Sequence, residues 1–142
     1  MSKSYNTVHY FGQSQVAQSL NQVNAAGSSI TLGSSNSGKV VTLNSTSGSL
    51  VNLGPPISGF TVEMITSAVG PHVVTAPSGT LYGSVVVGVS NSSSTLAITS
   101  GKTTLTTVTA GSVVGDRVRF VSDGTNFYVS GSVAKFNALT IA

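Results

Sequence analysis

The stretch RVRFVSDGTNFYVSG, residues 117–131, decides the fold. Apolar and polar residues alternate on both sides of Asp-Gly at 123–124, and this arrangement is a strong signal for a β-hairpin. Successive side chains of a strand point to opposite faces, so Arg117 and Arg119 are expected on the outer face. The same alternation predicts four core residues: Val118, Phe120, Phe127 and Val129.

Nine further segments combine β-branched residues with polar turns at regular spacing. They are residues 29–32, 39–43, 50–53, 60–65, 72–75, 81–87, 95–99, 103–108 and 138–142. Many short strands at such spacing, with no convincing helix after residue 28, predict an all-β domain. Layers with one apolar face must cover one another. We therefore expect an antiparallel β-sandwich of the jelly-roll or Greek-key type.

The beginning of the chain differs from the rest, because an aromatic segment is followed there by a Gln-, Asn- and Ala-rich run. We expect an extended N-terminal arm over residues 1–27 and a sandwich domain over residues 28–142. A short amphipathic helix within Ser14–Gly27 is the alternative for part of the arm. The length of 142 residues fits one domain with a core of its own.

The composition is poor in charge and rich in hydroxyl groups. Charged residues make up 6% of the chain, against about 25% in an average domain, and Ser and Thr together make up about 30%. The net charge of +3 is scattered, whereas nucleic-acid binders gather such charge into a patch. No segment approaches the roughly 20 apolar residues of a membrane span, and the N-terminus lacks the apolar region of a secretory signal. We expect no nucleic-acid or membrane partner, and folding where the protein is made.

Residues 33–39, GSSNSGK, fit seven positions of a nucleotide-binding loop. Such a loop needs Ser or Thr next, for Mg²⁺, and then a helix whose N-terminus binds phosphate. Val40 stands there instead, and a β-branched run follows. The pattern favours a turn that closes a hairpin between residues 29–32 and 39–43.

Groups for acid–base or metal chemistry are few: Glu63, Asp116, Asp123, His9 and His72. We expect Asp116 and Asp123 to bond the local backbone in turns, and Glu63 to form a surface contact with Arg or Lys. A metal site needs three or four ligands, and the chain has no Cys. We expect no enzyme activity, no cofactor and no metal.

Apolar and aromatic residues gather in both tails. Two interpretations stay open: the tails pack on their own sandwich, or they lie on a neighbouring subunit. An arm can add its backbone to an open sheet edge, and an edge strand without charge is prone to aggregate unless it is covered.

The segment AGSVVGDRVRFVSDGTNFYVSG, residues 110–131, resembles the C-terminal end of small β-rich structural modules of tailed bacteriophages. SGKVVTLN at 37–44 and VNLGPPISGFTVEMI at 51–65 are similar to their earlier part, so the resemblance covers about residues 29–132. Such modules occur in tail fibres and in capsid decoration, or cement, proteins. A single small domain with an arm is more similar to a cement protein, a jelly roll on the outside of an icosahedral head.

The resemblance implies a virion protein on the outer surface of the capsid, made in the host cytoplasm. Its partners would be the major capsid protein and further copies of itself, as a homodimer or homotrimer. The alternative is a tail-fibre or receptor-binding module that contacts a host surface glycan through Tyr82 and Tyr128. The expected contact residues lie in the arm, in the tail and, second in rank, on the hairpin: Tyr5, Tyr10, Phe11, Phe136, Leu139, Ile141, Arg117 and Arg119.

Overall fold

Short β-strands make up most of the computed structural model, which describes residues 22–25, 29–77, 79–89, 92–135 and 137–142. Within these ranges lies one short 3-10 helix, η1 (Ser34–Asn36). The strands are β1 (Gln22–Ala25), β2 (Ser29–Thr31), β3 (Lys39–Leu43), β4 (Leu50–Asn52), β5 (Thr61–Thr66), β6 (Val73–Thr75), β7 (Leu81–Val89), β8 (Ser92–Lys102), β9 (Thr104–Thr107), β10 (Arg117–Ser122), β11 (Phe127–Val133) and β12 (Leu139–Ile141). Each segment predicted as a strand forms one.

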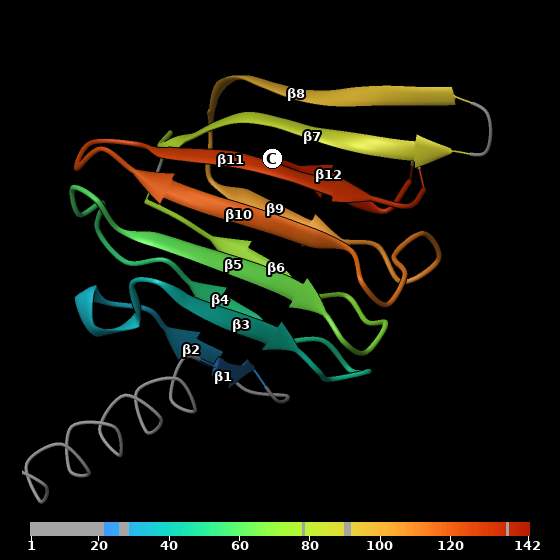
Figure 1. Cartoon of the computed structure of the whole chain (residues 1–142), viewed down its shortest axis with the longest axis horizontal. Coiled ribbons are helices and arrows are strands. Elements are labelled where there is room, and N and C mark those ends of the chain that lie inside the picture. Colours follow the sequence, from blue (N-terminus) through green and yellow to red (C-terminus); the bar gives the residue numbers. More distant parts are fainter. Residues whose placement is uncertain (1–21, 26–28, 78, 90–91, 136) are drawn as a thin grey trace, which may run out of the picture.

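Two sheets stack face to face (Figure 1). The seven-stranded sheet has the order β1-β3-β5-β10-β11-β7-β8, and the five-stranded sheet has the order β12-β9-β6-β4-β2. The wider sheet therefore extends past the narrower one, and β7 and β8 lie beyond β12 in Figure 1. The predicted all-β sandwich is confirmed.

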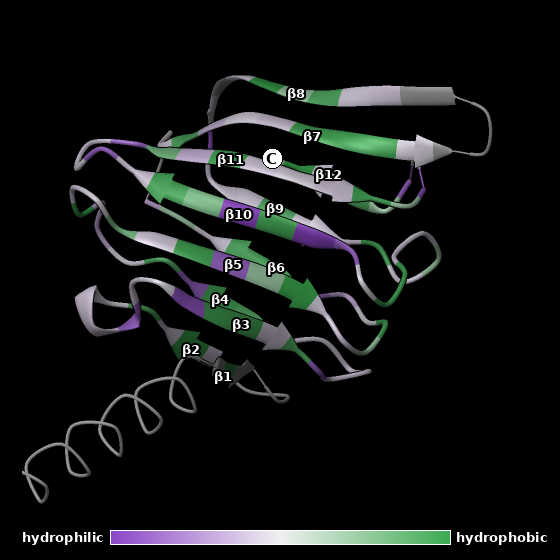
Figure 2. Cartoon of the chain, in the orientation of Figure 1, coloured by the Kyte–Doolittle hydropathy of each residue, from purple (hydrophilic) through white to green (hydrophobic). Residues whose placement is uncertain are grey.

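The hairpin formed by β10 and β11 follows the alternation of its sequence. Residues along β10 are exposed and buried in turn, and over the first part of the strand Figure 2 shows the matching change between hydrophilic and hydrophobic residues. The strands pair antiparallel from Arg117 with Ser132 to Ser122 with Phe127. All four predicted core residues are buried: Val118, Phe120, Phe127 and Val129.

The pairing of the strands differs from the expected antiparallel arrangement. Five of the ten described strand pairs are parallel: β1–β3, β3–β5, β2–β4, β4–β6 and β7–β11. From β1 to β6 the chain changes sheet at every strand. Parallel neighbours need a long crossover instead of a tight hairpin, and each crossover here contains a strand of the opposite sheet. Mixed sheets wound in this way replace the expected antiparallel jelly roll or Greek key.

The winding stacks corresponding apolar residues into rows. Val41 pairs with Val23 on one side and with Met64 on the other. In the facing sheet, Val51 pairs in the same way with Ile30 and Val74. This part of the chain builds its core as repeat proteins do, where each turn of chain contacts the next.

The GSSNSGK segment is a corner between the sheets and not the hairpin turn that the sequence favoured. β2 lies in the five-stranded sheet and β3 in the seven-stranded one, so the strands on either side of the segment do not pair. The corner holds η1, where the Gly33 amide donates a hydrogen bond to Asn36 Oδ1 at 2.9 Å. Strand β3 follows it directly, where a nucleotide-binding loop would need a helix.

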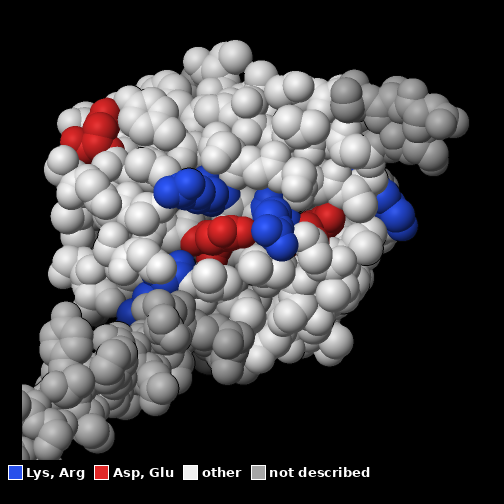
Figure 3. Space-filling view, in the orientation of Figure 1, with Lys and Arg blue, Asp and Glu red and all other residues white. Residues whose placement is uncertain are grey.

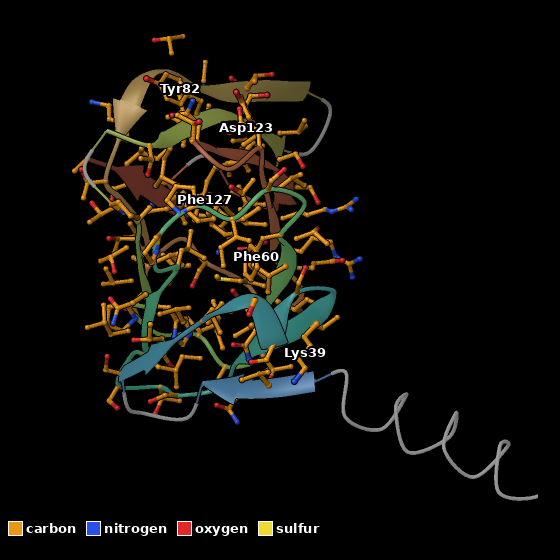
Figure 4. All side chains as sticks on the ribbon, turned by 90° about the vertical axis from the view of Figure 1, so that its left-hand side faces the viewer. Lys39, Phe60, Tyr82, Asp123 and Phe127 are labelled. Carbon is orange, nitrogen blue, oxygen red and sulfur yellow. The ribbon has the colours of Figure 1, made fainter. Side chains whose placement is uncertain are left out.

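The core lies between the two sheets. Phe60 and Phe127 form an edge-to-face pair with ring centroids 6.2 Å apart, a favourable aromatic geometry, and both lie in the middle of the molecule in Figure 4. Buried residues from both sheets surround this pair, and the largest of them include Phe120, Leu53, Leu81 and Leu105.

Both ends of the described chain belong to the sandwich. β1 pairs with β3, and Val23 packs against the core. The sandwich thus includes residues 22–25, which the sequence assigned to the arm. Because residues 22–25 form a strand, the alternative prediction of a helix within Ser14–Gly27 is wrong for these residues. Residues 1–21 lie outside the described residues. At the other end, β12 pairs with β9.

Candidate interaction surface

Charged side chains gather on the outer face of the seven-stranded sheet, in the middle of the view in Figure 3. Arg117 Nη1 lies 3.4 Å from Glu63 Oε1, and the side chains are 56% and 34% exposed. Arg119 Nε donates a hydrogen bond to Thr61 Oγ1 at 3.3 Å, beside a hollow of about 300 Å³. The outward direction of both arginines and the surface contact of Glu63 are confirmed. A pair this exposed contributes only about 0–1 kcal/mol.

Two tyrosines lie on neighbouring strands of the same face. Tyr82 of β7 and Tyr128 of β11 are direct neighbours in the parallel register, although they are far apart in the sequence. Tyr128 is 45% exposed, and its hydroxyl donates a hydrogen bond to Asp123 Oδ2 at 2.9 Å. In Figure 4, Tyr82 and Asp123 lie toward the β8 side of the molecule, and Lys39 lies toward β1. We call Tyr82 and Tyr128 the tyrosine pair.

The Asp123 carboxylate holds the β10–β11 turn together. Asp123 Oδ1 accepts hydrogen bonds from the backbone amides of Asn126 and Thr125, both at 2.8 Å. These bonds favour the ionised form, so the bond from Asn126, followed by those from Thr125 and Tyr128, lowers the pKa of Asp123. The hydrogen bond between Tyr128 and Asp123 also raises the pKa of the Tyr128 hydroxyl, because the protonated phenol donates to the carboxylate. The predicted local role of Asp123 is confirmed.

An apolar hollow of about 410 Å³ lies beside β7 and β11. Val86 is 47% exposed and Val114 is 61% exposed at its rim. Asp116 borders the hollow but is buried, and it accepts hydrogen bonds from the amides of Val113 and Ala134, each at 2.8 Å. Asp116 thus bonds the backbone, as predicted. Sequence reasoning missed Val86 because the run of valines in β7 gives both faces the same residue type.

The outer strands leave sheet edges open in the described part of the chain. β8 ends the seven-stranded sheet and has eleven residues, whereas β1, β2 and β12 are short. The one charged residue in β8 is Lys102, at the end of the strand, and β8 contains no Pro. Charge and Pro are the usual protections of an exposed edge. We call the free side of this strand the β8 edge.

The described contact residues of the C-terminal tail pack against the core, whereas the two arginines lie on the surface. Leu139 is 6% exposed within the core, and Ile141 packs partly against that core. For these two residues the structure supports packing on their own sandwich. The remaining predicted contacts lie outside the described residues: Tyr5, Tyr10, Phe11 and Phe136.

Groups suited to catalysis or metal binding are dispersed. His72 is fully buried, with its backbone amide bonded to Thr107 Oγ1 and its Nε2 2.8 Å from the Ala68 carbonyl oxygen. No three His, Cys, Asp or Glu side chains of the described residues come together as a metal site. In the same ranges, no helix has the length and apolarity to span a membrane.

Comparisons with protein-family models, with curated proteins and with solved structures found no match.

Proposed function

We propose that this protein is a structural component of a phage particle. It binds the outer surface of an assembled capsid and stabilises the lattice of the major capsid protein. The observation that carries this proposal is the long, nearly uncharged β8 edge, which no strand of the described residues covers and which favours ordered assembly with other subunits. The resemblance of residues 110–131 to phage structural modules points to the same class of protein.

The mechanism is selective binding to one state of the shell. A protein that spans several capsid subunits contacts the assembled lattice and not dispersed subunits, and binding to one state stabilises that state by mass action. A specific contact of standard size buries about 1,600 Å² in total. Several contacts from one oligomer add through effective concentration.

Titration of the purified chain against capsid shells and against dispersed capsid protein tests the proposal. We expect saturable binding to shells, little binding to dispersed subunits and a higher temperature of shell disruption. In virions, mass spectrometry should find a copy number comparable with that of the major capsid protein. Absence from virions, or equal binding to dispersed subunits, contradicts the proposal.

Deletion of residues 1–12 tests the arm as a contact element. These residues precede every described strand, so we expect the remaining chain to keep the circular dichroism and thermal unfolding of the sandwich. Attachment to shells should be lost, because Tyr5, Tyr10 and Phe11 are removed together. Unchanged occupancy on shells would show that the arm is not needed.

A second candidate function is glycan binding by a tail-fibre or receptor-binding module, and the tyrosine pair favours it. Exposed aromatic faces next to polar groups suit sugar rings, and Tyr128 lies beside the carboxylate of Asp123. The structure brings Tyr82 next to Tyr128 from another strand.

Binding of the chain to host surface polysaccharide, measured before and after Tyr128→Ala, tests this candidate. Tyr128→Phe keeps the ring and serves as the matched control. Loss with Ala and retention with Phe would support a glycan platform. Equal binding by all three chains contradicts a role of Tyr128. A low copy number in virions would favour this candidate over capsid cement.

A further inference from the structure

The β8 edge carries a sequence that reads nearly the same in both directions. β8 is SSSTLAITSGK, and Ala97 stands at its centre. On either side of Ala97 come Leu96 and Ile98, and then Thr95 and Thr99. A strand of this kind is self-complementary. When a second copy pairs with it antiparallel about the same central residue, apolar residues lie opposite apolar residues and Thr lies opposite Thr.

The two faces of the strand agree with this symmetry. Thr95, Ala97 and Thr99 are exposed on the outer face, whereas Ile98 is buried and Leu96 half-buried on the inner face. Leu96 is not fully covered because β7 and β8 extend beyond β12 (Figure 1).

We infer that two copies of this chain pair through the β8 edge. The strands run antiparallel about a twofold axis at Ala97, and the two seven-stranded sheets become one continuous sheet. Leu96 then faces the partner's Ile98, and Thr95 faces the partner's Thr99. Apolar pairs and Thr–Thr pairs across strands each stabilise a sheet by about 0.2–1 kcal/mol. The inference concerns the purified chain and does not depend on the proposed function.

Charge favours this orientation over a parallel one. Lys102 is the charged residue of β8, and in the antiparallel pair the two copies of Lys102 lie at opposite ends, about 30 Å apart at roughly 3.3 Å per residue. A parallel pair would place them side by side, where they repel. An isologous contact of this kind also closes on itself and does not build a fibre.

The geometry of β8 limits the length of the joint. β8 pairs regularly with β7 from Val89–Ser92 to Gly83–Ile98, and the register shifts between Gly83 and Leu81. The shift falls between Ile98 and Lys102, and a bulge bends a strand, so the joint is confined to the few residues around Ala97. The remaining described edge strands are shorter, with four residues in β1 and three each in β2 and β12.

Charge variants at the axis test the inference. Ala97 is exposed, so Ala97→Lys and Ala97→Glu should fold, but each places two like charges near the twofold axis. We expect each variant to self-associate about tenfold more weakly in sedimentation velocity. A mixture of the two should form heterodimers. Thr31→Lys, an exposed change on the edge strand β2, should associate like the wild type.

A cysteine variant tests the position of the axis. The chain has no Cys, so Ala97→Cys introduces one thiol, and two such thiols at the axis come within reach of a disulfide. We expect rapid oxidation to a dimer, and slow oxidation for Thr31→Cys. The inference is wrong if the wild type sediments as a monomer at every concentration, if Thr31→Lys weakens association as much as Ala97→Lys, or if the two thiols oxidise equally fast.

Discussion

Gly83 stands where β7 leaves its regular pairing with β8. Its φ angle of +128° lies in a region that side chains rarely adopt, and an added Cβ would lie 2.1 Å from the carbonyl oxygen of Val129. That oxygen belongs to the backbone of the neighbouring strand β11 and cannot move aside alone. Only Gly therefore fits at this position.

Gly83→Ala should destabilise the fold by about 2–5 kcal/mol, because it combines backbone strain with overpacking. Gly88→Ala in the same strand is the matched control, since its Cβ would lie no closer than 3.7 Å to any atom. We expect that change to alter stability by about 0.5 kcal/mol or less. Chemical denaturation of both variants measures the difference, and similar stabilities would contradict the tight contact at Gly83.

Asp123 should make the stability depend on pH in the acid range. Hydrogen bonds from Asn126, Thr125 and Tyr128 lower its folded pKa below the ordinary value of 3.8. The carboxylate thus stabilises the fold above pH 3.8, and this contribution is lost as the pH falls through the folded pKa. The difference in unfolding free energy between the wild type and Asp123→Asn should shrink between pH 6 and pH 2 in urea titrations. A difference independent of pH would show that the charge of Asp123 adds nothing.

At the scale of elements, β12 shows why an apolar tail is ambiguous in the sequence. Its Leu139 faces the core and its Thr140 faces solvent, yet the same alternation would suit a strand on a neighbouring subunit. In the structure β12 pairs with β9 of the same chain, which favours packing of this segment on its own sandwich.

Leu139→Ala should therefore act on stability. Truncation of a buried Leu costs about 2–5 kcal/mol, whereas Thr140→Ala on the exposed side should cost about 0.5 kcal/mol or less. Thermal unfolding of the two variants, together with shell binding below the melting temperature, separates the roles. Loss of binding without loss of stability in Leu139→Ala would instead make Leu139 a contact residue.

Turns are the elements that sequence reasoning handled least well. The Asp-Gly turn at 123–124 closes a hairpin, as predicted, but the Gly-, Ser- and Asn-rich segment at 33–38 carries the chain between sheets. Both turns have polar, turn-forming composition, because both need tight bends at the surface. Composition therefore locates a bend, but it does not tell whether the next strand pairs with the preceding one or crosses to the other sheet.

At the scale of the whole molecule, the low charge governs how binding should respond to salt. The chain has six Lys and Arg against three Asp and Glu, and its exposed ion pair joins Arg117 to Glu63. Attachment through apolar contacts and backbone hydrogen bonds should change less than about threefold between 0.1 M and 1 M salt, although the Debye length falls from about 10 Å to 3 Å. Shell binding at both concentrations measures this. A steep loss at 1 M salt would point to Arg117 and Arg119 as the contacts.

The sequence by itself determined where the strands after residue 28 lie and which of their residues face inward, because alternation with period two is a local property of the chain. It also indicated that Arg117 and Arg119 point outward and that Asp123 bonds the backbone of its turn. Only the tertiary structure decided which strands are neighbours. Among β1 to β6, the strands that pair within one sheet are separated in the sequence by a strand of the other sheet. That choice set Tyr82 beside Tyr128, put Leu139 in the core and left the β8 edge open. Pairing between distant strands depends on how two whole layers fill the space between them, and no short window of sequence contains that information.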